Sequence, residues 1–221
     1  SCTYTYLVSS GKGREALIID PVLEKTNEYV SYLKELDLKL VKVIDTHIHA
    51  DHISGMKELH KQTNCTNIMG KNSKSEVVNI KVKDNEKVKI ENIELVSMYT
   101  PGHTDCSYSF FMKDRIFTGD TLLINGTGRT DFQNGNPIDQ YHSLFNRILK
   151  LPENTYVYPA HDYKGEKVST IGDEKKKNPR LKVDSVDQYA ELMNNLNLDN
   201  PKMMDIAVPA NIKGKTLEQI K

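Results

Sequence analysis

The sequence has no long apolar run and no excess of either charge. A membrane-spanning helix needs about 20 consecutive apolar residues, and the apolar stretches here fall well short of that length. The 30 basic side chains of Lys and Arg balance 30 acidic ones, so there is no broad positive field of the kind that binds nucleic acid or anionic lipid. We therefore expect a soluble protein with neither nucleic acid nor a membrane among its partners.

Cysteine is also scarce and has no recognisable spacing. The three cysteines, Cys2, Cys65 and Cys106, include no C-x-x-C pair, and their odd number leaves one thiol unpaired. A disulfide framework is therefore not expected, which fits a reducing compartment or an organelle matrix. Cys106 lies three residues after His103, and we expect it to be a small buried side chain rather than a ligand.

The chain is long enough for one domain with a substantial core. It has 221 residues and no internal repeat or low-complexity linker, so we expect one domain over residues 1–221, with a short C-terminal extension from about residue 165. Because the chain opens at Ser1 rather than at methionine, a targeting segment that preceded it would lie outside this sequence.

The hydrophobic pattern predicts two groups of strands with helices before, between and after them. In the first half, strands are expected over 5–8, 16–20 and 38–45, and helices over 54–63 and over 26–38, the latter with Thr26 as its N-cap. In the second half, we expect a hairpin within 67–99 that turns at 83–85 or at 91–92, a strand pair over 107–120, a helix over 136–152, and a strand and loop over 155–163. This order favours a layered α/β sandwich over a doubly wound parallel sheet.

Four motifs place histidine or aspartate just after a predicted strand. They are DTHIHADH (45–52), TPGHTD (100–105), FTGDTLL (117–123) and YPAHDY (158–163). Loops that leave a rigid sheet commonly carry binding and catalytic side chains. Together the motifs offer the candidate ligands His47, His49, Asp51, His52, His103, Asp120 and His161. Imidazole and carboxylate donors without thiolate suit zinc, iron, manganese or nickel.

The cluster at 47–52 is the strongest single indication of a metal. It holds three histidines and an aspartate within six residues, whereas His103 or His161 alone would more often be an ordinary surface or core residue. His60 and His142 lie within predicted amphipathic helices and are expected to be structural. Spacing alone leaves open whether the site holds one metal or two.

The pattern H-x-H-x-D-H, followed by a distant His, then Asp, then His, resembles the metallo-β-lactamase superfamily over residues 3–212. The resemblance implies a four-layer αββα sandwich with the site at one edge, between the sheets. In dinuclear members the first metal is bound by the equivalents of His47, His49 and His103. The second is bound by the equivalents of Asp51, His52 and His161, and Asp120 bridges the two.

The segments around these motifs resemble one branch of the superfamily, the persulfide dioxygenases. They are GTGRTDFQNG (126–135), YPAHDYKGEKVSTIGDEKKKNPRL (158–181) and IAVPAN (206–211). The related glyoxalase II enzymes typically carry GCGR, and Glu-Tyr after the last histidine, where this chain has GTGR and Asp162-Tyr163.

This resemblance implies one Fe(II) per chain, bound by His47, His103 and Asp120, with coordination positions left free for substrate and O2. It implies that His49, Asp51, His52 and His161 lie beside the iron and orient its ligands, or bind an alternative second metal. Catalytic roles would fall to Asp51, His52, His161 and Tyr163. The implied reaction oxidises glutathione persulfide with O2 and water to sulfite and glutathione. The alternative is a glyoxalase II-type hydroxyacylglutathione thioester hydrolase with a dinuclear Zn/Fe site.

Arg129 is the candidate for binding glutathione, because a guanidinium group matches a carboxylate in two hydrogen bonds. A structural salt bridge to Asp131 is the alternative role. Tyr163 would donate its hydroxyl group toward substrate, or would serve in packing. The basic run at 175–177, with Arg180 and Lys182, would attract glutathione or form a solvated helix face. The resemblance also implies the mitochondrial matrix for a eukaryotic protein, and otherwise the cytoplasm, and it leaves a homodimer open.

Overall fold

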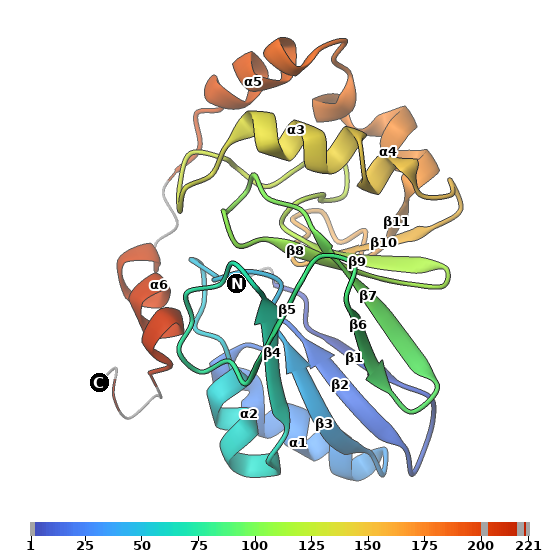
Figure 1. Ribbon diagram of the computed structural model, residues 1–221, viewed down its shortest axis with the longest axis vertical. Coiled ribbons are helices and arrows are strands. Elements are labelled where there is room, and N and C mark those ends of the chain that lie inside the picture. The colour runs from blue at the N-terminus through green and yellow to red at the C-terminus, as the bar shows by residue number, and fades with distance from the viewer. Residues whose placement is uncertain (1–2, 200–202, 216–218, 220–221) are drawn as a thin grey trace.

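Two β-sheets lie face to face in the computed structural model, which describes residues 3–199, 203–215 and 219, and helices cover their outer faces (Figure 1). The first sheet has the order β1-β2-β3-β4-β5 and the second has the order β11-β10-β9-β8-β7-β6. The strands of the first sheet are β1 Tyr6–Ser9, β2 Glu15–Ile19, β3 Lys39–Ile44, β4 Thr66–Gly70 and β5 Ile80–Val82. Those of the second are β6 Lys87–Ile90, β7 Ile93–Tyr99, β8 Tyr108–Met112, β9 Arg115–Gly119, β10 Tyr156–Pro159 and β11 Ser169–Thr170.

The helices form the two outer layers. The helices are α1 Thr26–Glu35, α2 Met56–Thr63, α3 Pro137–Phe145, α4 Ile171–Lys177, α5 Val186–Asn194 and α6 Met204–Lys213. In Figure 1, α1 and α2 lie below the first sheet, α3, α4 and α5 lie above the second, and α6 stands apart at one side. Short 3-10 turns span Leu23–Lys25, Ile148–Lys150 and Pro179–Leu181. The four-layer αββα sandwich is therefore confirmed.

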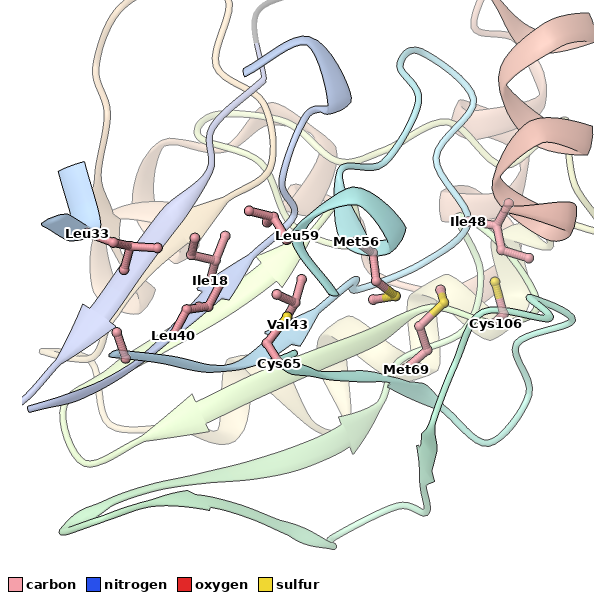
Figure 2. Close-up of a cluster of buried hydrophobic side chains, with 11 residues drawn as sticks. Ile18, Leu33, Leu40, Val43, Ile48, Met56, Leu59, Cys65, Met69 and Cys106 are labelled. Atoms are coloured by element: carbon pink, nitrogen blue, oxygen red, sulfur yellow. The ribbon is translucent and has the colours of Figure 1, made fainter. Parts of the chain in front are cut away.

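Alternation along the strands supplies apolar side chains to separate layers. On β2, Ala16 and Ile18 point into the cluster that α1 and α2 cover, whereas Leu17 and Ile19 point between the two sheets. A third cluster fills the space between the second sheet and the helices α3 and α5. Figure 2 shows the first of these clusters, where Ile48 and Cys106 lie side by side at one end. Ile48 lies between the first two histidines of the THIHADH motif, so its packing in this cluster holds the motif against the core.

Two predictions about helix ends were wrong. Thr26 is the first residue of α1 and not its N-cap; its hydroxyl group donates to the Leu23 carbonyl oxygen of the preceding 3-10 turn. The helix expected over 136–152 ends at Phe145 and is followed by a 3-10 turn. The break occurs where Arg147 turns inward, because its guanidinium donates to the Tyr99 carbonyl oxygen at 2.6 Å and to Asp84.

Of the two turns considered for the hairpin within 67–99, the one at Glu91 and Asn92 is correct, since β6 and β7 pair around it. Cys106 is buried, as expected; Cys65 is also buried and both thiols are free, whereas Cys2 lies outside the described residues. Over the part of the chain that the structure describes, no helix is both long and apolar enough to cross a membrane.

Candidate metal centre

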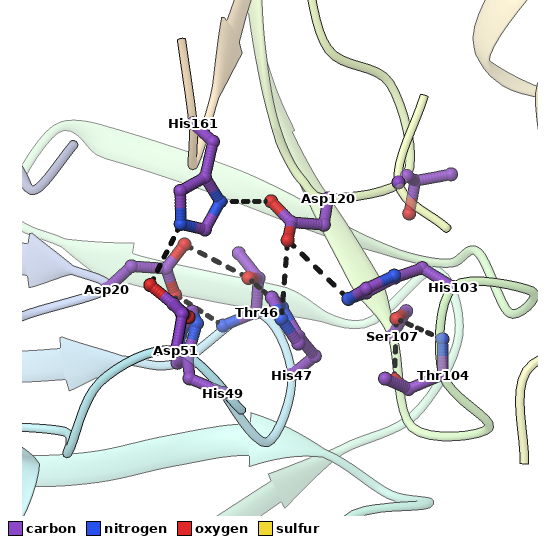
Figure 3. Close-up of polar contacts among 12 residues, drawn as sticks. Asp20, Thr46, His47, His49, Asp51, His103, Thr104, Ser107, Asp120 and His161 are labelled. Atoms are coloured by element: carbon purple, nitrogen blue, oxygen red, sulfur yellow. Dashed lines mark hydrogen bonds and ion pairs between the residues drawn. The ribbon is translucent and has the colours of Figure 1, made fainter. Parts of the chain in front are cut away.

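The candidate ligands come together because the strands that carry them end at one edge of the sandwich. His47 follows β3, His103 follows β7, Asp120 follows β9 and His161 follows β10. Strands β9 and β10 are parallel, and β7 has the same direction as β9 because both are antiparallel to β8. The loops after these strands therefore open at the same edge of the second sheet. The loop after β3 reaches the same place from the first sheet (Figure 3).

Three groups of three side chains lie close enough to share an ion; two of them consist only of the predicted ligands, and the third is Asp20, Asp45 and His49. In the group His47, His103 and Asp120, one ligand atom from each residue lies within 4.8 Å of the others. The Asp120 Oδ2 atom lies 3.5 Å from His103 Nε2 and 4.0 Å from His47 Nε2 (Figure 3). The second group is His49, Asp51 and His52. The structure thus brings together the seven side chains that the sequence singled out.

His161 joins the two groups. Its Nδ1 atom lies 2.7 Å from Asp120 Oδ1, and its Nε2 atom lies 2.9 Å from Asp51 Oδ2. Burial alone would lower the pKa of His161, but the Asp120 and Asp51 charges raise it well above its ordinary value. Asp51 also accepts a hydrogen bond from Thr3 Oγ1 at 3.0 Å. The carboxylates of the two groups are therefore held in place through one imidazole.

Asp20 orients two histidines at once, although the sequence analysis did not single it out. Its Oδ1 atom lies 3.2 Å from His49 Nε2, so the Nε2–H group donates to it and Nδ1 is left free. Its Oδ2 atom accepts the Thr46 hydroxyl at 3.0 Å, and Thr46 Oγ1 lies 3.0 Å from His47 Nδ1. His47 Nδ1–H then donates to Thr46, which leaves Nε2 free to face Asp120. The available signal was an aspartate that ends a buried strand, in ALIID.

The side chains present fit a bound metal ion. Among the described residues, His49 Nδ1 and His52 Nε2 are buried ring nitrogens without a hydrogen-bond partner, and a buried polar atom of that kind needs one. Burial also lowers the pKa of His47 well below its ordinary value and so keeps its imidazole neutral. At His49 the Asp20 charge outweighs burial and raises the pKa to about 9, so a metal bound there would have to displace the Nδ1 proton. Burial opposes ionisation of Asp120 and Asp51, but His161 outweighs it and holds both carboxyl pKa values well below normal. Neutral imidazole and ionised carboxylate are the forms that bind metals.

The GTGR turn supports the other side of the centre. Gly128 N donates to the Asp120 carbonyl oxygen at 2.8 Å, and His103 Nδ1 lies 2.7 Å from the Arg129 carbonyl oxygen. That second bond fixes the proton of His103 on Nδ1 and leaves Nε2 for a metal. A Cβ atom on Gly128 would lie 2.1 Å from the Asp120 carbonyl oxygen, so only glycine fits here.

A cavity of about 510 Å³ opens onto His47, His103 and Asp120. Its wall includes the GTGR turn, and its other lining residues include Tyr163, Lys164, Arg180 and Leu198. Cavities of a few hundred cubic ångströms are the size that holds small-molecule ligands. Tyr163 is 73% exposed, and its ring stacks on that of His161 with a 5° angle between the planes. His47, His103 and Asp120 therefore line a pocket and do not lie on open surface.

Arg129 adopts the alternative role that the sequence left open. Its guanidinium makes two hydrogen bonds of 2.6 Å to Asp131, donates to the Asp199 carbonyl oxygen at 2.7 Å, and lies over the Phe132 ring. Arg180 is the residue that sequence reasoning undervalued. It lies in the cavity wall, where it hydrogen-bonds Thr127, and no carboxylate among the described residues pairs with it. The lysines at 175–177 lie on a mostly solvated face, where Lys177 pairs with Asp173.

The remaining histidines lie outside the centre. His60 Nδ1 lies 2.6 Å from the Cys65 carbonyl oxygen, and His142 Nδ1 lies 3.0 Å from the Asn146 side-chain amide. Both make hydrogen bonds to residues just beyond the ends of their helices, and neither lies in the metal centre.

Comparison with known proteins places these features in a family context. The family model described as the metallo-beta-lactamase superfamily matches residues 3–83 and 72–161. The mitochondrial persulfide dioxygenase ETHE1 of Mus musculus is 42% identical over 216 residues, which cover 96% of this chain and 84% of that protein. The crystal structure of ETHE1 from Myxococcus xanthus superposes with a TM-score of 0.93 at 45% identity, and covers 96% of this chain and 93% of that one.

A hydrolase is a more distant relative. The hydroxyacylglutathione hydrolase of Dictyostelium discoideum is 35% identical over 170 residues, which cover 72% of this chain and 62% of that protein. The similarity to the dioxygenases is therefore both higher and longer.

Proposed function

Because the chain belongs to the metallo-beta-lactamase superfamily and, within it, to the persulfide dioxygenases, we propose that it is an Fe(II)-dependent persulfide dioxygenase. Its reaction would convert glutathione persulfide, O2 and water into sulfite and glutathione. The observation that carries the proposal is the meeting of His47, His103 and Asp120 at the floor of a cavity in a chain 42% identical to such an enzyme.

One iron would be held by His47, His103 and Asp120, two imidazoles and a carboxylate. Bound iron would supply the redox chemistry that activates O2 and the persulfide sulfur. His49, Asp51, His52 and His161 would surround it without binding it, and water would meet the unpartnered ring nitrogens of His49 and His52. Their contacts with Asp20 and with one another hold the three ligands in place, as the partners of metal ligands commonly do.

The pair His161 and Asp51 would move protons. The reaction GSSH + O2 + H2O → GSH + SO3²⁻ + 2H⁺ releases two protons from a site whose imidazoles are almost fully buried. His161 contacts Asp120 on the inner side and Asp51 on the outer side, and the Asp51 side chain is 28% exposed. We assign the route from the centre to water to this pair. His52, hydrogen-bonded to Asp51, would hold that carboxylate in place.

The basic wall of the cavity would bind the glutathione part of the substrate. Arg129 would have to exchange Asp131 for a substrate carboxylate, whereas Arg180 needs no such exchange. Tyr163 lies at the cavity beside His161 and would donate its hydroxyl group toward the substrate.

Replacing Arg129 with lysine should raise KM for glutathione persulfide several-fold and leave kcat nearly unchanged.

A thioester hydrolase with two metals is the second candidate, because His49, Asp51 and His52 form a second group of possible ligands and a hydrolase is among the relatives. Metal analysis and an oxygen electrode separate the two functions. The dioxygenase predicts about one iron per chain, O2 uptake with glutathione persulfide, and no such uptake in His103→Ala. Two metals per chain, hydrolysis of lactoylglutathione and no O2 uptake would overturn it in favour of the hydrolase.

The location is proposed from the name of a relative. The mouse relative is named as mitochondrial, so we propose the mitochondrial matrix if the source is a eukaryote and the cytoplasm otherwise. A homodimer stays a prediction, which light scattering of the purified protein would test.

A further inference from the structure

We propose that Asn211, on α6, is a positioning residue that shapes the metal loop and thereby sets how firmly the centre retains its ion. The metal loop is defined here as residues 46–54, the segment between β3 and α2 that carries the THIHADH motif. This inference rests on the metal centre and not on the reaction that the centre performs.

The Asn211 side chain contacts the metal loop at three points. Its Nδ2 group donates to the carbonyl oxygens of His49 and His52, each at 2.9 Å. Its Oδ1 atom accepts from the backbone N–H of Ser54 at 2.8 Å. The residue is 7% exposed, so water does not compete freely for these bonds. Both N–H groups and the oxygen of the amide are thus used on one short stretch of backbone.

These contacts matter because the metal loop has no regular structure of its own to satisfy its carbonyl groups. Other carbonyls of the loop also bond to distant segments: that of Thr46 accepts from Tyr108 N, and that of Ile48 accepts from Gln133 Nε2. Asn211 differs from these donors because it holds two carbonyls at once. Both belong to histidines whose ring nitrogens, Nδ1 of His49 and Nε2 of His52, are buried without a partner in the described part of the chain.

A change in the backbone at those two residues would move their imidazoles. In so short a loop, the position of each ring follows from the φ and ψ angles of its own residue and its neighbours. An amide that fixes both carbonyls therefore fixes the spacing of the His49 and His52 rings, which pack 4.3 Å apart between centroids. His47, two residues before His49, lies in the same constrained stretch. Through the backbone, Asn211 therefore influences the proposed ligand His47, and the His49 and His52 rings beside it, without touching any of the three rings.

Helix α6 is held in place by other contacts, so the role of the Asn211 side chain can be tested separately. Ser75 Oγ donates to the backbone carbonyl of Asn211 at 2.9 Å, and Glu76 N donates to that of Ile212 at 2.8 Å. Apolar side chains of α6, Ala207 and Ala210, pack in a cluster with Leu23 and Ile53. Removing the side-chain amide would leave these contacts, and with them the docking of the helix.

The test compares Asn211→Asp with Ser75→Ala. Asn211→Asp keeps the shape of the side chain but replaces two donors with an oxygen that faces two carbonyl oxygens. Ser75→Ala weakens the docking of α6 and leaves the amide contacts intact. For each variant we would load the full chain with Co²⁺ or Fe²⁺ under anaerobic conditions, measure the rate of metal release to a chelator, and record the Tm of the metal-free protein.

We expect Asn211→Asp to release metal roughly 10- to 100-fold faster than the wild type, the range found for residues that support metal ligands. Ser75→Ala should lower the Tm and leave the release rate within about twofold of the wild type. If the aspartate variant does not fold, Asn211→Ala, which adds no charge, takes its place in the test. It should also release metal faster than the wild type. The proposal would be overturned if the folded Asn211 variants released metal at the wild-type rate. It would also be overturned if Ser75→Ala released metal as fast as they do. No turnover is measured, so the result stands apart from the dioxygenase assignment.

Discussion

Gly128 brings the backbone of the GTGR turn against Asp120 and His103. A Cβ atom there would lie 2.1 Å from the Asp120 carbonyl oxygen and 2.8 Å from His103 Nδ1. The first distance can be relieved only by moving the backbone of Asp120, and the second only by moving the His103 ring, and both residues are proposed ligands. The absence of a side chain at this residue is thus what allows two ligand-bearing segments to approach each other.

Gly128→Ala should therefore displace Asp120 or His103, with loss of most of the bound iron and a Tm lower by several degrees. Gly126→Ala, in the same turn, is the matched control, because its Cβ atom would find no neighbouring atom closer than 4.0 Å. Iron content per chain and thermal unfolding would be measured for both. Full iron occupancy in Gly128→Ala would contradict the tight packing described here.

A buried carboxyl group should give the metal-free protein a distinct pH dependence. Burial raises the pKa of Asp45 from 3.8 to about 7. Between these values the folded protein holds a proton that the unfolded chain has released, so the free energy of unfolding falls as the pH rises through this window.

Asp45→Asn removes that ionisation, so the stability of the variant relative to the wild type should rise by about 1–3 kcal/mol between about pH 4 and about pH 7. Urea unfolding of both metal-free proteins at several pH values would measure the difference. A difference that does not change with pH would mean that Asp45 ionises in the folded protein as freely as in the unfolded chain.

At the scale of an element, α3 supports the turn that carries His103. Its first turn packs so closely on Gly102 that a Cβ atom there would lie 2.3 Å from Gln140 Cα. Asn136 N donates to the Gly102 carbonyl oxygen at 2.8 Å. The Asn136 side chain caps α3, since its Oδ1 atom accepts from the backbone N–H groups of Ile138 and Asp139. The start of this helix and the His103 turn are therefore fixed together.

Asn136→Ala should lower the free energy of unfolding by about 1 kcal/mol, the usual cost of losing an N-cap. The matched control is Ser185→Ala in α5, where the capping oxygen accepts one hydrogen bond, from Gln188 N at 3.2 Å. Its loss should be smaller than that of Asn136→Ala. Chemical denaturation with unchanged m values would test the ranking, and a larger loss in Ser185→Ala would reverse it.

The strand ends could be predicted from the sequence, whereas contacts between distant segments could not. Each ligand motif directly follows an apolar run, and parallel strand ends converge, so the position of His47, His103, Asp120 and His161 follows from local pattern. Periodicity could not reveal that Arg147 would turn inward and end α3 early, because its partners lie 48 and 63 residues away.

Within the metal centre, too, contacts between residues distant in sequence could not be predicted. Asp20 and Asn211 carry no ligand signature, and each acts through a histidine, or a histidine's backbone, that is remote in sequence. Arg129 shows how a local contact can compete with a proposed substrate contact. A residue two positions away, Asp131, is an available partner in any fold, and the structure contains that ion pair. Local alternatives of this kind compete with every functional assignment made from a motif.

For the whole molecule, a metal at the centre would link loops from both sheets. His47 lies on the loop that follows β3 of the first sheet, whereas His103 and Asp120 lie on loops that follow strands of the second. An ion that binds only the folded protein stabilises it by about 4 kcal/mol when free metal is about 1,000 times Kd. For a chain of 221 residues that free energy corresponds to a rise in Tm of roughly 8–16 °C.

Removing the metal with a chelator should therefore lower the Tm by roughly that amount. His103→Ala is the control, because a protein that binds no metal should unfold at the same temperature with and without the chelator. Differential scanning calorimetry would make both measurements. An unchanged Tm in the wild type would mean that the sheets are held together without help from the ion.

The clamp of α6 on the metal loop also bears on how the centre matures in a cell. Asn211 lies 162 residues after His49 in the chain. At the usual pace of translation it leaves the ribosome roughly 8–30 s later. During that interval the nascent chain already carries its cluster of imidazoles, but the carbonyls of His49 and His52 still lack their amide partner. The histidines can then meet any metal in the cell before the loop has its final shape. Correct iron loading is accordingly expected only after α6 has been synthesised and has docked on the metal loop.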